Sequence, residues 1–202
     1  MNPPIKFIFF DVGDVMLRFR HEFEEYEKMY GMDSIKGRDL FLKEMNNLSL
    51  GNTDPQTVWK MICQELGHNE LSKKKIIDLE RKVFTPIMET HTLVKDLSKK
   101  YEIGILSNIF HGTFEMELQA GLIPNIDYKH IVESCKISLK KPDKAIFEHA
   151  QSLLDVPKET VLLVDDLEKN CVAAREFGWQ AFQFDEINPS ISTKKIRSLL
   201  NF

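Results

Sequence analysis

Two kinds of hydrophobic pattern divide the chain. Short, nearly continuous apolar runs, which are typical of strands buried on both faces, lie at residues 5–10, 102–106 and 161–164. Between the first two runs, apolar residues instead recur every three or four positions, which predicts amphipathic helices. The pattern therefore predicts a buried sheet with a long helical segment inserted after its first strand.

The inserted segment separates the first two strands by about ninety residues, which is too many for a single crossover helix. Asp54 before Pro55 predicts an N-cap followed by a proline in the first helical turn, and Gly67 fits the end of that helix. Residues 17–85 are therefore expected to form a small helical bundle. Its apolar faces are Phe19, Phe23, Tyr26 and Tyr30; Leu40, Phe41, Met45 and Leu48; Val58, Trp59, Ile62 and Leu66; and, after Ser72 as a cap, Ile76, Leu79 and Val83.

After Pro86 the pattern alternates between helices and strands. Alternation of this kind predicts a parallel sheet with right-handed crossovers. The expected strands are residues 102–106, 131–132, 161–164 and 180–184, and the expected helices are residues 112–120, 143–154, 168–177 and 191–200, with one more around Leu93, Val94 and Leu97.

Polar residues follow the buried strands. Asp11 ends the first strand, Ser107 and Asn108 follow the second, and Asp165–Asp166 follows the strand at 161–164. Ligands of open α/β sheets bind at the carboxyl ends of the strands, where a carboxylate can attack a substrate or hold a metal ion. Asp11 alone could equally cap a turn. Two adjacent carboxylates repel each other, however, so Asp165–Asp166 favours a functional site.

A lysine pair, Lys140–Lys141, precedes Pro142 and a predicted helix. The ordered set of aspartate, serine, lysine and an aspartate pair resembles the four motifs of the haloacid dehalogenase (HAD) superfamily of hydrolases. The resemblance covers residues 1–16 and about 90–185. It implies an α/β fold whose doubly wound, parallel-sheet (Rossmann-like) core is made of residues 1–16 and 86–202, with residues 17–85 as an α-helical cap.

The resemblance also implies a phosphatase reaction with Mg2+ as cofactor. A dianionic phosphate repels an incoming carboxylate, so a divalent cation must neutralise charge, and Mg2+ prefers oxygen ligands. By resemblance, Asp11 is the nucleophile that forms an aspartyl-phosphate, and Lys141 is the catalytic cation, although physical reasoning alone does not separate Lys141 from Lys140. The implied substrate binders are Ser107 and Asn108, and the implied metal ligands are Asp11, the backbone carbonyl of Gly13, and Asp166 with Asp165 beside it.

The opening motif departs from the superfamily pattern at Gly13. Many of its phosphatases carry a second aspartate at this position as general acid and base, whereas here Asp14 comes one residue later. Whether Asp14 or water delivers the proton to the leaving group stays open. A subgroup with Asp-Leu-Gly-Asn at this motif is similar and resembles sugar-phosphate phosphatases. The expected substrate is therefore a small phosphorylated metabolite, with sugar phosphates as one candidate class.

Two other functions stay open. A 2-haloacid dehalogenase also uses an aspartate nucleophile and lacks the second aspartate, but it needs no metal, so Asp165–Asp166 argues against it. Arg18 and Arg20 are the candidates for its halide-binding arginine. The other alternative is a catalytically weak HAD-like regulatory protein that has lost its acid.

The inserted segment and one histidine are the features expected to lie near the entrance of the site. The insert, with hinges near residues 15–17 and 85–89, is expected to act as a lid that excludes water and contacts the substrate. His111 is the one histidine placed to reach the site after Ser107–Asn108, and we expect it to be a bystander.

Composition narrows the setting. The net charge of −4 does not indicate the basic surface that binds nucleic acids. No apolar run reaches the length of a membrane-spanning helix. Three widely spaced cysteines without metal-type spacing, and no secretory signal, favour reduced thiols in a cytoplasm. The expected partner is therefore a small molecule rather than nucleic acid or membrane. The oligomeric state is not predicted.

Overall fold

The structure is a computed structural model that describes residues 3–18 and 22–202. Phe19, at the start of the first helical pattern, and Arg20, a candidate halide ligand, lie outside the described residues. Among the described residues, no helix is both long enough and apolar enough to cross a membrane.

The core is a five-stranded parallel sheet in the order β5-β4-β1-β6-β7. Its central strand pairs with two neighbours, so that Phe10 lies opposite Ile105 on one side and Val164 on the other. The chain builds the sheet outward from β1 in one direction and then in the other, as expected of a doubly wound fold. The strands are β1 (Phe7–Phe10), β4 (Glu102–Ser107), β5 (His130–Glu133), β6 (Val161–Asp165) and β7 (Gln180–Gln183).

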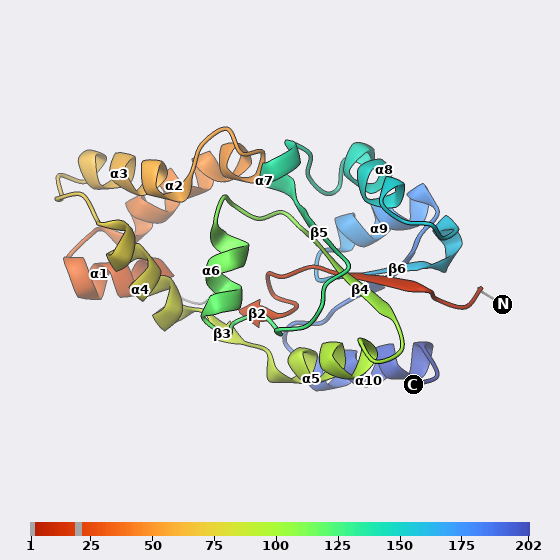
Figure 1. Ribbon diagram of the computed structural model, residues 1–202. Coiled ribbons are helices and arrows are strands. Elements are labelled where there is room, and N and C mark those ends of the chain that lie inside the picture. The colour runs from red at the N-terminus through yellow and green to blue at the C-terminus, as the bar shows by residue number, and fades with distance from the viewer. Residues whose placement is uncertain (1–2, 19–21) are drawn as a thin grey trace.

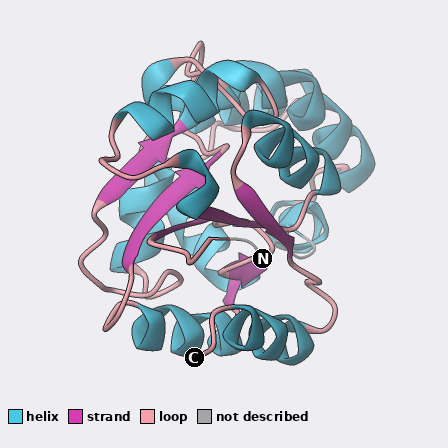
Figure 2. Cartoon of the chain, turned by 90° about the vertical axis from the view of Figure 1, so that its right-hand side faces the viewer, coloured by secondary structure: helices cyan, strands magenta, loops and turns pink. Residues whose placement is uncertain are grey.

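Helices cover both faces of this sheet, which explains why β1 reads as a continuous apolar run (Figures 1 and 2). Ile8 and Phe10 face one hydrophobic cluster, and Phe7 and Phe9 face the other. Burying each of these side chains stabilises the fold by about 1.5–3 kcal/mol. One face carries α5 (Met88–Leu97) and α10 (Pro189–Leu199), and the other carries α8 (Lys144–Ser152) and α9 (Glu168–Phe177). Three shorter elements complete the core: α6 (Thr113–Gln119) after β4, α7 (Ser134–Ile137) after β5, and the 3-10 turn η1 (Lys158–Thr160) before β6.

Four helices lie between two short strands that follow β1 in the chain, and we call them the helical insert. The insert has an aromatic centre, in which the rings of Tyr26 and Trp59 lie 3.9 Å apart between centroids. Its helices lie at one end of the molecule (Figure 1), and their division from the core as a separate cap domain stays a prediction. They are α1 (Glu22–Tyr30), α2 (Ser34–Ser49), α3 (Pro55–Glu65) and α4 (Lys73–Val83).

The sequence signals for these helices hold to different degrees. α3 begins as predicted, since Asp54 accepts a hydrogen bond from the Thr57 N–H at 3.0 Å. α2 begins earlier than its apolar spacing indicated, because Asp33 caps it by accepting from the Lys36 N–H at 2.9 Å.

The two segments expected to be hinges pair with each other. β2 (Leu17–Arg18) and β3 (Thr85–Pro86) form a two-stranded antiparallel ribbon, which periodicity did not predict because each strand is only two residues long. The chain therefore enters and leaves the helical insert at one place.

Candidate active site

Asp11 stands at the point where the sheet changes its direction of winding. It directly follows β1, its backbone N–H donates to the carbonyl of Val164 at 2.9 Å, and its side chain accepts from the Val12 N–H at 2.8 Å. Crevices at such switch points are the usual ligand sites of open α/β sheets. Asp11 is nevertheless largely buried, so its carboxylate faces the protein rather than bulk water.

Lys141 is the cation of this site. Its side chain is fully buried, and Nζ lies 3.0 Å from Oδ2 of Asp11 and 2.5 Å from Oδ2 of Asp165. Lys140 instead points to the helical insert, where Nζ donates to the side-chain oxygen of Asn46. Burial and direction thus separate two lysines that physical reasoning from the sequence did not.

Asp165 is committed to holding this arrangement together. Its carboxylate accepts from Lys141, from the side-chain amide of Asn170 at 2.9 and 3.1 Å, and from the Leu167 N–H at 2.9 Å. The side chain of Asn170, in α9, therefore orients Asp165.

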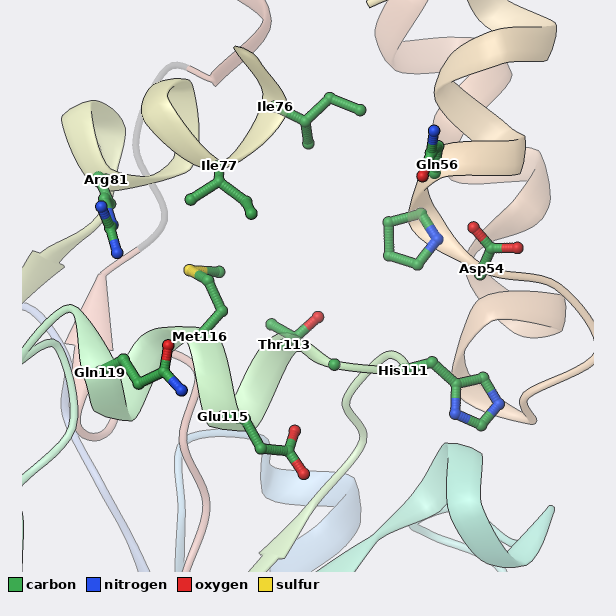
Figure 3. Close-up of a pocket in the computed structure, with 12 residues that line it drawn as sticks. Asp54, Gln56, Ile76, Ile77, Arg81, His111, Thr113, Glu115, Met116 and Gln119 are labelled. Carbon is green, nitrogen blue, oxygen red and sulfur yellow. The ribbon is translucent and has the colours of Figure 1, made fainter. Parts of the chain in front are cut away.

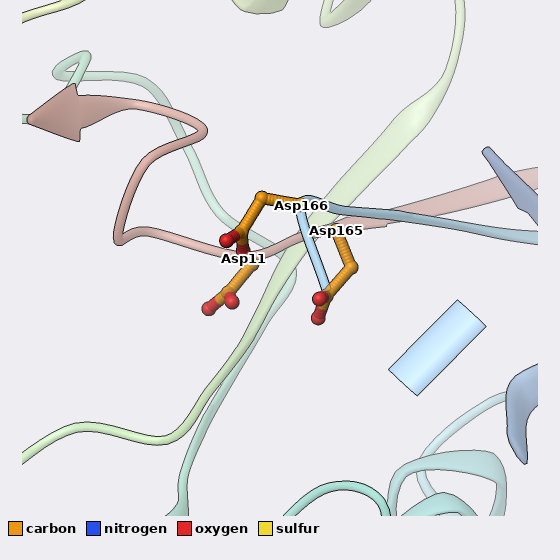
Figure 4. Close-up of side chains that lie close together, drawn as sticks. All are labelled: Asp11, Asp165 and Asp166. Atoms are coloured by element: carbon orange, nitrogen blue, oxygen red, sulfur yellow. The ribbon is translucent and has the colours of Figure 1, made fainter. Parts of the chain in front are cut away.

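The three carboxylates form a compact acidic group. Asp11, Asp165 and Asp166 each offer an oxygen, and these atoms all lie within 4.8 Å of one another (Figure 4). Burial, followed by the charges of Asp11 and Asp165, raises the pKa of Asp166 to about 7. Burial also raises the pKa of Asp11, against the opposing charge of Lys141. One lysine does not balance three carboxylates, so the group is suited to a further cation.

The chemistry of these donors fits Mg2+, which takes carboxylate and carbonyl oxygens. Since Asp165 is occupied by Lys141 and Asn170, the residues left to hold a metal are Asp11 and Asp166, with a backbone carbonyl. Gly13, the predicted carbonyl donor, lies in the turn between β1 and β2, where its backbone forms a bridge with Leu17.

Ser107 and Asn108, predicted to bind substrate, have different surroundings. Ser107 is buried at the end of β4, and its hydroxyl lies near enough to Asp11 to oppose the rise in the pKa of that carboxyl. The Asn108 side chain instead donates to the Lys141 carbonyl and accepts from the Lys141 N–H, both at 2.8 Å. Both ends of this amide are therefore occupied by the protein.

Ser134, at the start of α7, is a site-supporting residue that sequence reasoning missed. Its hydroxyl accepts from the Ile109 N–H at 3.1 Å and donates to the Ile109 carbonyl at 3.3 Å. It follows the strand predicted at 131–132, so the position of a hydroxyl after that strand was the available signal.

A cleft of about 660 Å3 lies between the helical insert and α6. Figure 3 shows Arg81 and Gln119 at one end, Asp54 and His111 at the other, and the apolar side chains of Ile77 and Met116 in between. His111, expected to be a bystander, therefore contributes to the cleft wall rather than to the carboxylate group.

The insert also touches the core beyond the β2–β3 ribbon. Gly51, at the end of α2, adopts φ +73°, and a Cβ atom there would lie 2.1 Å from the carbonyl oxygen of Cys135 and 2.8 Å from Nε2 of His111. Close approach of the two parts thus depends on glycine at this position.

A family model described as haloacid dehalogenase-like hydrolase matches residues 21–183. The chain belongs to the haloacid dehalogenase-like hydrolases. A curated mouse protein, acyl-CoA dehydrogenase family member 10, is 28% identical over 120 residues. That match covers 58% of this chain and 10% of the mouse protein, so the chain spans about a tenth of that relative's length.

Solved structures of other HAD proteins share the fold. A predicted HAD-like family hydrolase from Porphyromonas gingivalis is 21% identical with a TM-score of 0.77, covering 99% of this chain and 100% of that one. A HAD family enzyme from Bacteroides thetaiotaomicron, solved as an aspartate-to-alanine variant with magnesium and inorganic phosphate, is 20% identical (TM-score 0.73; 90% and 95% covered). The L-2-haloacid dehalogenase of Xanthobacter autotrophicus, solved with chloropropionic acid covalently bound, is 18% identical (TM-score 0.65; 89% and 77% covered).

Proposed function

We propose that this HAD-like hydrolase is a magnesium-dependent phosphatase that acts on a small phosphorylated metabolite through an aspartyl-phosphate on Asp11. The observation that carries the proposal is the surplus of negative charge around Lys141, where Asp11, Asp165 and Asp166 converge. A haloacid dehalogenase would need no metal and so no such surplus, and the sequence comparisons fit either chemistry.

The residues divide the work as follows. Asp11 attacks the phosphorus atom, the bond to the leaving oxygen breaks, and water then hydrolyses the aspartyl-phosphate to regenerate the carboxylate. Lys141, held by Asp165, orients the Asp11 carboxylate, and its positive charge stabilises the charge that develops on the phosphoryl oxygens. The Ser107 hydroxyl is placed beside Asp11 to hydrogen-bond a phosphoryl oxygen.

Asp11, Asp166 and the carbonyl of Gly13 would hold the metal. When bound, Mg2+ neutralises part of the phosphate charge so that a carboxylate can approach. The high pKa of Asp166 is consistent with this role, because a nearby cation would favour its ionised form.

The helical insert supplies the substrate contacts. We place the body of the substrate in the cleft between α4 and α6, and the insert acts as a lid on the β2–β3 ribbon. Polar groups at both ends of the cleft and the apolar wall between them suit a metabolite with both kinds of surface, such as a sugar phosphate. A cytoplasmic location and the absence of nucleic-acid or membrane partners stay predictions.

The test is a screen of phosphorylated metabolites and of p-nitrophenyl phosphate with purified protein, in Mg2+ and in excess chelator. The proposal predicts turnover that requires the metal and is lost in Asp11→Asn. Release of chloride from 2-chloropropionate in chelator would contradict the phosphatase proposal and favour a haloacid dehalogenase. Phosphate binding without turnover of any ester would favour the regulatory protein.

A further inference from the structure

We propose that Asn108 is a positioning residue for Lys141 and not a ligand of the substrate. The inference rests on the proposed function, because it assumes that Lys141 acts on Asp11 during catalysis. It concerns a contact between two loops that are 33 positions apart in the chain.

The first observation is the geometry of the Asn108 amide. Its nitrogen donates to the carbonyl of Lys141 and its oxygen accepts from the N–H of Lys141, each at 2.8 Å. Two hydrogen bonds to the same residue fix both the position and the rotation of that stretch of backbone. Asparagine is suited to this task because one short, planar group carries both a donor and an acceptor.

The second observation is what the fixed backbone carries. The Lys141 side chain is fully buried and ends between Asp11 and Asp165. A lysine ammonium is a point charge on a flexible four-carbon stem, so its place depends on where the stem begins. Both polar atoms of the Asn108 side chain, by contrast, are already bound to the Lys141 backbone, which turns the amide toward that loop.

The third observation is that Asn108 itself is anchored. Ser107 before it pairs in register with Glu133 at the end of β5, and Ile109 after it is held through both backbone groups by Ser134. The loop after β4 therefore provides a rigid base against which Lys141 is set.

The test uses Asn108→Ala, which removes both hydrogen bonds, and Asn108→Asp, which keeps an acceptor for the Lys141 N–H. A displacement of a catalytic group by about 1 Å can cost about a hundredfold, so kcat should fall roughly 10- to 100-fold in Asn108→Ala. KM and the inhibition constant of inorganic phosphate should change by less than about threefold, because no substrate contact is lost. Asn108→Asp keeps that acceptor but sets a carboxylate oxygen against the Lys141 carbonyl, so its kcat should also fall while KM changes little.

The matched control is Asn47→Ala in the helical insert. Asn47 also donates a side-chain hydrogen bond, to Glu44 at 2.8 Å, but has no contact with the carboxylate group. It should leave kcat and KM unchanged. Melting curves check that each variant folds; if Asn108→Ala does not fold, Asn108→Asp carries the test.

A rise in KM and in the phosphate inhibition constant with kcat unchanged would make Asn108 a substrate ligand and overturn the inference. Crystal structures of the Asn108 variants give a readout that needs no activity. Nζ of Lys141 displaced from Asp11 and Asp165 supports positioning, and Nζ in its original place contradicts it. If the native protein hydrolyses no phosphate ester, the proposed function fails, and the crystallographic result still decides the role of Asn108.

Discussion

The carboxylate group and the cleft between the insert and α6 are built in opposite ways. Asp11 follows β1, and Asp165 is the last residue of the adjacent parallel strand β6. Both are buried and are fixed by Lys141 and by backbone N–H groups. The cleft is lined by side chains that project from α3, α4 and α6, from both the insert and the core. A rigid, buried group suits the reaction itself, whereas a surface made by separate helices suits the choice of substrate. Changes in the first region should therefore abolish activity, and changes in the second should redirect or weaken it.

The largest effect should come from Asp11→Asn, because an amide keeps the shape of the carboxylate but is not an adequate nucleophile. Phosphatase kcat should fall by at least about a thousandfold, with the melting temperature nearly unchanged. The matched control is Asp78→Asn on the exposed side of α4, which should be silent. A variant at Asp11 that keeps more than a few per cent of activity would rule out the covalent mechanism.

Asp166→Asn should come next. Removing this carboxylate leaves Asp11 and neutral oxygens, which hold Mg2+ poorly. The Mg2+ concentration needed for half-maximal activity should rise by more than about a hundredfold, because the loss of an indirect partner alone costs about 10- to 100-fold. Titration of activity and isothermal calorimetry with Mg2+ measure this effect. Full activity of native protein in excess chelator would contradict the metal requirement.

A smaller effect is expected from the leaving group, because Gly13 stands where many relatives have an acid. A positioned general acid typically contributes about 10²–10⁴ in rate, and less when the leaving group departs easily. A sugar 1-phosphate should therefore be hydrolysed faster than the matching 6-phosphate. Gly13→Asp should narrow the difference in kcat/KM. Equal rates in the native protein would refute this argument, and a preference that persists in Gly13→Asp would assign the choice to the shape of the cleft.

Gly51→Ala should disturb the packing of the insert against the core without changing the carboxylate group. The added Cβ would meet the Cys135 carbonyl oxygen at 2.1 Å. We expect kcat/KM to fall about tenfold, since a misplaced lid misplaces the substrate. Gly67→Ala is the matched control, because Gly67 has a similar φ of +71° but nothing within 4 Å of its Cβ position. Equal losses in both variants would mean that backbone strain, not docking, is responsible.

The smallest effect concerns the stability of the metal-free protein. Burial and the neighbouring carboxylates raise the pKa of Asp166 from 3.8 to about 7, so the folded state binds more protons than the unfolded state between these values. The contribution of Asp166 to the free energy of unfolding is therefore fully present below pH 3.8 and is lost as the pH rises to about 7. The loss is on the order of 2 kcal/mol, after allowing for the partial exposure of this side chain. Melting curves in chelator should show this loss, and Asp166→Asn should reduce it. A native protein whose stability profile matches that of the variant would disprove the linkage.

Most of the fold could be predicted from local signals. The run ending at Phe10 predicted a strand covered on both faces, and the structure confirms helices on each side of it. The start of α2 was misplaced because the cap, Asp33, lies outside the apolar pattern. The β2–β3 ribbon was missed because strands of two residues are too short to show any periodicity.

The sequence by itself determined which residues are candidates for the chemistry. Asp11 and Asp165–Asp166 stand out because burying carboxylates at the ends of buried strands costs free energy, which favours a functional role for them. Only the tertiary structure decided how these residues are held: that Lys141 and not Lys140 is buried between them, that Asn108 binds the Lys141 backbone, and that Gly51 meets Cys135. Each of these contacts joins segments distant in the chain. Their geometry depends on the packing of the whole sheet and its helices, which no local pattern encodes.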